Sequence, residues 1–222
     1  MNKFTLYSYF RSSTAYRARI ALNIKEVSYQ QIPIHLLEDG GQQHKQEYLK
    51  LNPAAEVPTL VHNEKVISQS FAIIEYLDEI IADHPLFPKD AFGRAKVRQI
   101  CENINCGIHP LTNLKVMQYL TNDMNSTDEL NSKWQQHWIK KGLVALEKIL
   151  ETTSGTFAYG DRVSCADIFI IPQIFSANRF GICIEDCPHL KKINQNCLVL
   201  EAFKNAHPFC QPDTPENLRT NK

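Results

Sequence analysis

The sequence predicts two domains of different class: an α/β domain over residues 1–82 and an all-α domain over residues 92–222, joined by a linker at 83–91. Segments in which polar and apolar residues alternate, as they do in half-buried strands, occur only before the linker. Beyond the linker, apolar residues recur at helical spacing alone. The linker itself is rich in proline and aspartate, which interrupt regular structure.

The composition sets limits on the kind of protein. With 222 residues, 43% of them hydrophobic, the chain can bury a core in two modest domains. Lysine plus arginine and aspartate plus glutamate each total 24, so no basic excess indicates a nucleic-acid partner. The start of the sequence shows no signal-peptide core, and no apolar run is long enough to span a bilayer. We therefore expect a cytoplasmic protein without a membrane partner.

The first predicted strand and helix flank a turn of hydroxyl residues. Residues 3–8 alternate as a strand does, and apolar residues from Ala15 onward recur at helical spacing. Ser12, Ser13 and Thr14 lie between them, where a hydroxyl can cap the first free N–H groups of a helix. A helix N-terminus also favours a nearby anion, and a thiolate is one candidate. Serine at this place is also an ordinary cap, so this turn alone does not define a site.

The rest of the first domain continues with alternating strands and helices. Pro33 within the second strand favours an edge position, because proline cannot donate to a sheet ladder. Asn63-Glu64 predicts a tight turn between the third and fourth strands. The resulting order, β-α-β-α-β-β-α, is that of a thioredoxin-like domain. The predicted segments are a strand at 29–34, a short helix at 46–51, strands at 57–61 and 65–68, and a helix from Ser70 to Ile81.

The second domain is predicted to consist of helices. A long helix is expected to bend around Gly107 and Pro110. Ser164 and Asp167 stand at capping-box spacing before another helix, which Pro172 should kink. The tail from Pro208 is expected to be irregular. The remaining predicted helices cover Trp134–Leu150 and parts of Leu190–His207.

The cysteines constrain the chemistry. There are seven, none lies in the first 100 residues, and no Cys-x-x-Cys occurs, so neither a disulfide framework nor a zinc ribbon is expected. The eight histidines show no ligand spacing, so we expect no metal site. The first domain cannot carry out dithiol exchange with its own residues. Sulfur chemistry at the serine turn would therefore need a thiol brought from outside.

Taken together, the motifs resemble the zeta class of glutathione transferases, and within it the maleylacetoacetate isomerases. The resemblance covers essentially the whole chain, because its pieces occur in the same order and spacing. They are Tyr7–Ser13, Arg17–Leu22, Asn52-Pro53 with Val57–Leu60, Gln69–Leu77, Gly160–Asp167, Asn178–Phe180 and Gln211–Pro215. The zeta signature often reads Ser-Ser-Cys, whereas this chain has Thr14 at the third place. A mechanism that needs a protein cysteine there is excluded.

The resemblance implies glutathione as the cofactor. Ser13, and alternatively Ser12 or Thr14, would donate a hydrogen bond to its sulfur. Lowering a thiol pKa by two units requires about 2.7 kcal/mol. One charge-assisted hydrogen bond, at about 1.5–3 kcal/mol, together with the helix dipole would supply that amount.

The same resemblance assigns the groups that would hold the rest of glutathione. Val57, before a cis Pro58, would offer its backbone N–H and C=O to the cysteinyl part. Gln69 and Ser70 would bind the γ-glutamyl carboxylate at a second helix N-terminus. Two further implied contacts are weaker: Gln43 near the glycyl end, and His109 near the glutathione or dimer region.

The implied substrate is a small dicarboxylate with a cis double bond, and the implied assembly is a homodimer. Arg11 and Arg179 are the candidates to hold its two carboxylates, because a guanidinium grips a carboxylate with two parallel hydrogen bonds. Each could instead form an ordinary salt bridge. The adjacent Arg17 and Arg19 are expected to be structural.

The leading hypothesis is isomerisation of maleylacetoacetate in tyrosine and phenylalanine breakdown. Maleylpyruvate isomerase, with a shorter substrate, is the nearest alternative. A general glutathione transferase acting on α-halo acids is another hypothesis in which the protein is an enzyme. A non-enzymatic docking module is the alternative from a different class, against which the retained Ser12, Ser13, Gln69 and Ser70 argue.

Overall fold

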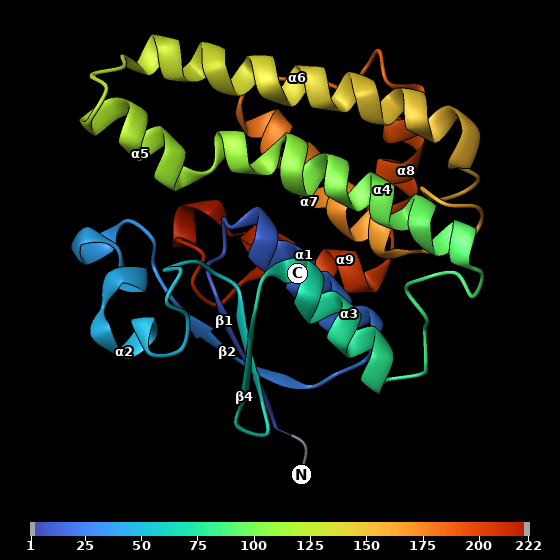
Figure 1. Cartoon of the computed structure of the whole chain (residues 1–222), viewed down its shortest axis with the longest axis horizontal. Coiled ribbons are helices and arrows are strands. Elements are labelled where there is room, and N and C mark those ends of the chain that lie inside the picture. The colour runs from blue at the N-terminus through green and yellow to red at the C-terminus, as the bar shows by residue number, and fades with distance from the viewer. Residues whose placement is uncertain (1–2, 220–222) are drawn as a thin grey trace. The chain divides into compact units, whose positions relative to one another are not determined.

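The computed structural model describes residues 3–219, whose contacts divide into two compact units. The first unit contains the chain up to Pro85 together with the segment from Val199 onward, and the second contains Leu86–Leu198. Figure 1 shows the elements of both units along the chain.

The first unit is built on a four-stranded mixed sheet. Its strands are β1 (Phe4–Ser8), β2 (Tyr29–Pro33), β3 (Thr59–His62) and β4 (Lys65–Ser68). Their order across the sheet is β2-β1-β3-β4, with β2 parallel to β1 and the other neighbouring pairs antiparallel. The predicted thioredoxin-like class is confirmed. Pro33 lies on an edge strand, as expected of a residue without an N–H group.

The hairpin between β3 and β4 turns as its sequence predicts. Asn63 and Glu64 both have positive φ angles, of 48° and 68°. Two consecutive residues with positive φ make the tight turn whose twist matches that of the flanking strands.

Three α-helices of the first unit follow the predicted order: α1 (Ser13–Ile24), α2 (Gln46–Leu49) and α3 (Ser70–Ile80). Short 3-10 turns at Glu38–Gly40 and Gln42–His44 precede α2. In α1, every residue from Ala15 to Leu22 is buried. Arg17 and Arg19 are both buried within this stretch, as expected of residues with a structural role.

The C-terminal segment explains why α1 is buried so completely. Helix α9 (Glu201–Ala206) packs along α1, and Figure 1 shows the two side by side. Arg19 Nε donates to the carbonyl of Ala206 at 3.0 Å, and Asn23 Nδ2 donates to that of Ala202 at 3.0 Å. The predicted helical domain ran from 92 to 222, whereas the structure gives residues 199–219 to the first unit. Two 3-10 turns, Pro208–Cys210 and Glu216–Leu218, shape the tail that was expected to be irregular.

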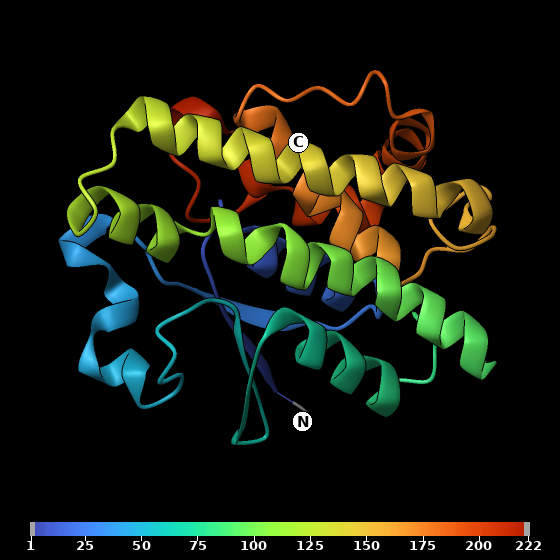
Figure 2. The same ribbon diagram turned by 45° about the horizontal axis from the view of Figure 1, so that its top comes forward.

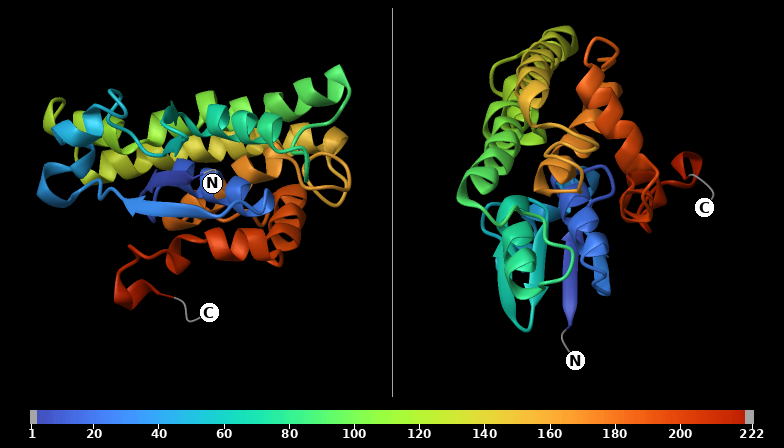
Figure 3. Two further views of the ribbon diagram at one scale, coloured as in Figure 1. Left: turned by 90° about the horizontal axis from the view of Figure 1, so that it is seen from below. Right: turned by 90° about the vertical axis from the view of Figure 1, so that its right-hand side faces the viewer.

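The second unit is helical, as predicted. It contains α4 (Ala91–Gly107), α5 (Leu114–Asn122), α6 (Asp128–Thr153), α7 (Cys165–Arg179) and α8 (Pro188–Leu198). Helices α4 and α6 run alongside each other (Figure 2), and α7 packs between α4 and α8 (Figure 3). At Gly142 of α6, a Cβ atom would lie 2.2 Å from the Ile108 side chain. The glycine therefore allows Ile108, which follows α4, to pack closely against α6.

The long helix predicted to bend is instead interrupted. Helix α4 ends at Gly107, a 3-10 turn covers His109–Thr112, and α5 begins at Leu114. Pro110 cannot donate the hydrogen bond that would continue α4, which accounts for the break. Helix α5 was not predicted from the sequence.

The predicted cap of α7 is present. The Asp167 carboxylate accepts from the Ser164 backbone N–H at 2.8 Å and from its hydroxyl at 2.9 Å. A third donor, the backbone N–H of Ala158, lies at 2.8 Å. Beyond this cap, α7 continues through Pro172 to Arg179.

Within residues 3–219, no helix is both long and apolar enough to cross a membrane. All seven cysteines are free thiols.

Candidate active site

The serine turn consists of Ser12, Ser13 and Thr14 and joins β1, which ends at Ser8, to α1, which begins at Ser13. The buried guanidinium of Arg19 holds the backbone that leads into this turn. That group donates to the Ser8 hydroxyl at 2.9 Å and to the carbonyls of Tyr9 and Phe10 at 3.3 and 3.1 Å. The aromatic rings of Tyr9 and Phe10 belong to an apolar cluster with Ala15, Tyr48 and Val57. The turn therefore rests on a packed base.

The three hydroxyls of the turn have different hydrogen-bond roles. Thr14 Oγ1 donates to the Val57 carbonyl at 2.8 Å, which uses its single hydrogen. The 2.9 Å contact between Ser12 Oγ and Thr14 Oγ1 must then have Ser12 as its donor. Ser12 Oγ also accepts from the Ala15 N–H at 3.2 Å, as an N-cap does. Ser12 and Thr14 are thus both committed within the protein.

Ser13 is the hydroxyl of the turn that keeps its hydrogen available. Ser13 is the first residue of α1 and is 8% exposed. Its hydroxyl has no hydrogen-bond partner among residues 3–219. The N-terminus of α1 adds positive potential at the same place. The arrangement can stabilise a bound anion through Ser13.

The segment before β3 lies directly beside this turn. The Val57–Pro58 peptide bond is cis, as the resemblance implied. The Val57 carbonyl accepts from Thr14, whereas the Val57 N–H donates to no group within the described part of the chain. The backbone donor of Val57 therefore remains available beside Ser13, while its carbonyl is already partly used.

A second helix N-terminus belongs to the same unit. Gln69 precedes α3 with a positive φ of 71°, and Ser70 is its first residue. The buried Arg17 places Nη1 3.3 Å from Ser70 Oγ, which brings a positive charge behind this helix end. Gln69 Nε2 donates to Glu56 Oε2 at 3.3 Å. Dipole and guanidinium together favour an anion at this end of α3.

Gln43 and Arg11 complete the predicted residues of the first unit. Gln43 is buried, and its Nε2 donates to the Leu36 carbonyl at 3.3 Å, while its Oε1 has no hydrogen-bond partner in the described part of the chain. Arg11 is half-buried next to Ser12, and its guanidinium makes no ion pair or hydrogen bond within residues 3–219. The salt bridge weighed for Arg11 as an alternative is therefore not formed by those residues.

The remaining two predicted residues lie in the second unit. His109 begins the 3-10 turn after α4 and is half-buried. Arg179 ends α7, is exposed, and carries its guanidinium carbon 5.6 Å from the ring centroid of Phe180.

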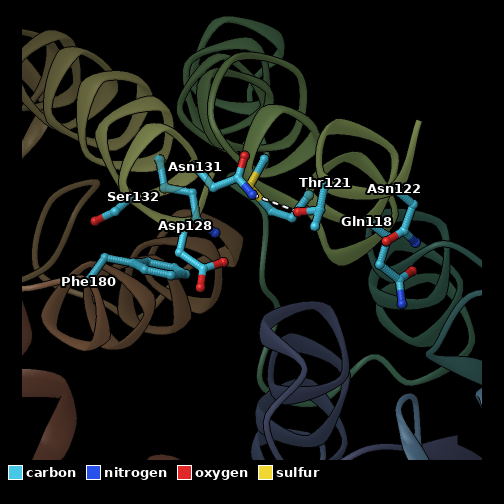
Figure 4. A pocket seen from close by; sticks show the side chains of 9 residues that line it. Gln118, Thr121, Asn122, Asp128, Asn131, Ser132 and Phe180 are labelled. Carbon is cyan, nitrogen blue, oxygen red and sulfur yellow. Dashed lines mark hydrogen bonds between the residues drawn. The ribbon is translucent and has the colours of Figure 1, made fainter. Parts of the chain in front are cut away.

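An open cavity of about 480 Å³ with both polar and apolar lining lies in the second unit beside Phe180. Figure 4 shows the Asn131 amide nitrogen pointing to the Thr121 hydroxyl, at 2.7 Å. The Asn131 Oδ1 atom is buried and has no hydrogen-bond partner among the residues that the structure describes. The lining residues include Gln118, Thr121, Asn122, Asp128, Asn131 and Phe180.

No group of three or more His, Cys, Asp or Glu side chains within residues 3–219 could hold a metal ion. The chemistry that the first unit offers is hydrogen bonding to an anion from Ser13, the Val57 N–H and the two helix N-termini.

Three contributors near the site were not identified as such from the sequence. Arg17 supports Ser70, Glu56 orients Gln69, and Asp213 accepts from the Phe10 N–H at 2.8 Å. Ser13 and Arg17 are one helical turn apart on the same face of α1, and this spacing could have indicated that Arg17 lies near the site. The other two join segments far apart in the sequence and have no local signal.

Comparison with known proteins gives consistent results. The family model described as the N-terminal domain of glutathione S-transferase matches residues 2–79, and the model for the C-terminal domain matches residues 112–204. Maleylacetoacetate isomerase of Rattus norvegicus is 45% identical over 215 residues, covering 97% of both chains.

Solved structures are similar over nearly the full length. One, titled the holo structure of maleyl pyruvate isomerase, a bacterial zeta-class glutathione S-transferase, matches with a TM-score of 0.91 and 35% identity, covering 95% of this chain and 100% of that one. Another is maleylacetoacetate isomerase from Anaeromyxobacter dehalogenans 2CP-1 with bound dicarboxyethyl glutathione and citrate. It matches with a TM-score of 0.85 and 34% identity, covering 97% of this chain and 100% of that one.

Proposed function

Since the chain belongs to the glutathione S-transferase family, and within it to the zeta class, we propose that it converts maleylacetoacetate to fumarylacetoacetate with glutathione as cofactor. The observation that carries the proposal is the Ser13 hydroxyl at the N-terminus of α1, beside the N–H of Val57; neither donor has a hydrogen-bond partner within residues 3–219. The first 100 residues contain no cysteine, so the reacting sulfur comes from glutathione.

The first chemical step is ionisation of the glutathione thiol. A free thiol has a pKa of about 8.5, so only a few per cent is thiolate at neutral pH. The Ser13 hydroxyl donates to the sulfur, and the positive end of α1 stabilises the charge further. Ser12 and Thr14 act through the turn, because their hydrogens are engaged with Thr14 and with the Val57 carbonyl.

The rest of glutathione is held by backbone groups and by the N-terminus of α3. The Val57 N–H, before cis Pro58, donates to the cysteinyl carbonyl. The γ-glutamyl carboxylate lies at Gln69 and Ser70, where Arg17 adds positive charge. The unpartnered Oε1 of Gln43 supports its role at the glycyl end. His109 is retained as a weaker glutathione contact.

The dicarboxylate substrate is held by two arginines. Arg11 precedes the serine turn and has no protein partner among residues 3–219, which supports its role in gripping one carboxylate. Arg179 grips the other. Their positive charge also stabilises the enolate that forms during reaction.

The reaction has two steps that restore the cofactor. The thiolate adds to one carbon of the cis double bond, forming a C–S bond and an enolate whose former double bond can rotate. Collapse of the enolate breaks the C–S bond, releases the thiolate and leaves the trans alkene. The dicarboxyethyl glutathione bound by the Anaeromyxobacter isomerase joins glutathione to a dicarboxylate, as such an adduct does.

We further propose a homodimer in the cytoplasm that acts in tyrosine and phenylalanine breakdown, with residues 1–82 as the glutathione-binding domain, 83–91 as linker, and helices α4 to α8 of the second unit as substrate domain. Sedimentation equilibrium tests the dimer directly.

The test of function is a rate measurement with and without glutathione on maleylacetoacetate and maleylpyruvate side by side. We expect turnover to require glutathione and to be faster with maleylacetoacetate. Faster turnover of maleylpyruvate would reassign the substrate. Turnover of neither, with glutathione bound, would reject isomerisation.

A further inference from the structure

The C-terminal motif Gln211–Pro215 has no part in the proposed chemistry, yet it reaches the serine turn. Asp213 Oδ2 accepts a hydrogen bond from the backbone N–H of Phe10 at 2.8 Å, across 203 positions of sequence. Phe10 directly precedes Arg11 and stands two residues before Ser12. Gln31 of β2 places its amide nitrogen 3.5 Å from the other oxygen of Asp213.

Phe10 is held from both sides by groups of opposite charge. Its N–H meets the Asp213 carboxylate, and its carbonyl accepts from Arg19 Nη2 at 3.1 Å. Burial lowers the pKa of Arg19 to about 10, and the negative charge of the nearby Asp213 acts in the opposite direction. Arg19 therefore stays cationic at neutral pH, and the backbone of Phe10 is fixed between an anion and a cation.

The tail that carries Asp213 is itself firmly attached. Gln211 Nε2 donates to the carbonyls of Asn205 and His207 at 2.9 and 2.8 Å, which anchors the tail to the end of α9. Thr214 Oγ1 donates to the Pro208 carbonyl at 2.6 Å. Gln211 and Thr214 are both buried. Asp213 is thus presented to Phe10 from a preorganised support on either side.

We propose that Asp213 is a positioning residue for the catalytic turn: the C-terminal tail fixes the Phe10 peptide, and through it the placement of Ser13 and Arg11. This inference rests on the proposed function, because it assigns Asp213 to the same site. In this role Asp213 acts through the backbone of Phe10 and not by direct contact with the thiol or the substrate.

The effect should fall on thiol ionisation and turnover more than on glutathione affinity. The hydrogen bonds of Asp213 within residues 3–219 go to Phe10 and Gln31, and not to Val57 or to the N-terminus of α3, so we expect most of the glutathione-binding groups to survive its loss. The Ser13 hydroxyl, by contrast, sits three residues beyond Phe10. A small displacement of a reacting geometry can cost up to about a hundredfold in rate.

The experiment compares full-length Asp213→Ala and Asp213→Asn with the wild type. Glu216→Ala is the matched control, because it removes an exposed carboxylate from the same tail without a contact to Phe10. Four quantities are measured: the pKa of the bound glutathione thiol by ultraviolet absorbance, glutathione affinity, kcat for the isomerisation, and the melting temperature.

For Asp213→Ala, we expect a raised thiol pKa and a kcat lowered about ten- to a hundredfold, with glutathione affinity within about threefold of wild type. Asp213→Asn should recover most of both losses, because its amide oxygen can still accept from Phe10. Glu216→Ala should behave as wild type. Unchanged thiol pKa and kcat in a folded Asp213→Ala protein, whatever its melting temperature, would overturn the proposal, as would a failure of Asp213→Asn to recover.

If Asp213→Ala does not fold, Asp213→Glu replaces it, since the extra methylene shifts the carboxylate while keeping its charge. A lowered kcat supports the proposal and an unchanged kcat overturns it. If wild-type protein binds glutathione without lowering its thiol pKa, the proposed function is rejected instead.

Hydrogen exchange at the Phe10 amide separates failure of the proposed function from failure of the Asp213 proposal. It should be faster in Asp213→Ala than in wild type, because it reports the hydrogen bond between Phe10 and Asp213 without depending on the reaction.

Discussion

At the scale of single residues, the direction of two hydrogen bonds decides what the serine turn can do. Thr14 donates to the Val57 carbonyl, which obliges Ser12 to donate to Thr14. Ser13 alone among these three hydroxyls has its hydrogen free within residues 3–219. A threonine in place of the signature cysteine thereby gives the turn a stronger internal donor, because a thiol donates only weakly.

Replacing Ser13 with alanine should raise the pKa of the bound glutathione thiol and lower kcat about a hundredfold at pH 7, since removal of one charge-stabilising donor typically costs that much. Ultraviolet titration of the bound thiol and a pH–rate profile measure both effects, and the rate deficit should narrow at high pH, where the thiol ionises unaided. Ser12→Ala is the control: loss of a helix cap should cost about 1 kcal/mol of stability with a smaller change in thiol pKa. Equal thiol effects in the two variants would contradict the assignment.

Replacing Thr14 with valine removes the bond to the Val57 carbonyl while nearly conserving volume. The Val57 segment should then hold glutathione less well, and KM for glutathione should rise about fivefold, which corresponds to one net hydrogen bond of about 1 kcal/mol. Thr14→Ser keeps the hydroxyl and should leave KM near the wild-type value. Steady-state kinetics with varied glutathione measures the difference, and a normal KM in Thr14→Val would show that the bond is dispensable.

At the scale of elements, the start of α7 carries a buried acid. Asp167 is fully buried, and this burial raises its pKa to about 6, although the hydrogen bonds from Ala158 and Ser164 act in the opposite direction. The same carboxylate caps α7, so the local structure of the helix and its response to pH depend on one group.

The free energy of unfolding should reflect this titration. An unfolded aspartate has a pKa of about 3.9. Between that value and about 6, the folded protein holds a proton at Asp167 that the unfolded chain has lost. The contribution of Asp167 to stability is therefore largest below about pH 4, declines as the pH rises to about 6, and is constant above.

Urea unfolding of wild type and Asp167→Asn between pH 4 and 7 measures this slope. Wild type should lose stability relative to the variant as the pH rises from about 4 to about 6, and the difference should then stay constant. A carboxyl NMR titration of Asp167 provides a direct check in wild type. A midpoint near 4, with parallel stability curves, would show that the hydrogen bonds fully offset the effect of burial.

At the scale of the whole molecule, the first unit is assembled from both ends of the chain. Helix α9 and the tail cover α1, and the buried Arg19 spans from the Ala206 carbonyl to the serine turn. The second unit is inserted between these segments of sequence. The first unit therefore depends on residues that follow the helical unit in the sequence.

A fragment of residues 1–85 should not fold by itself. Without α9, the apolar surface of α1 and the guanidinium of Arg19 would lose their cover, and a buried arginine with missing acceptors is strongly destabilising. Nitrogen–proton NMR spectra should be poorly dispersed for 1–85 alone and better dispersed after addition of a peptide of residues 199–222. A scrambled peptide of the same composition is the control. A well-dispersed spectrum of 1–85 alone would contradict the expectation.

The sequence determined those features that depend on near neighbours. The strand and helix periodicities, the edge position of Pro33, the hairpin at Asn63-Glu64 and the cap of α7 were all predicted correctly, because each is set within a few residues. Helix α5 was missed: it has nine residues, none of them buried, and a segment that short shows little more than two turns of periodicity.

Only the tertiary structure decided the partners of the site. Which serine keeps its hydrogen depends on Val57, 43 positions from Thr14, and the charge behind Ser70 comes from Arg17, 53 positions away. The tail of the chain reaches Phe10 through Asp213 across 203 positions. A local pattern can specify that a hydroxyl or a carboxylate is present, but the group that it bonds is chosen by packing, which brings distant segments together.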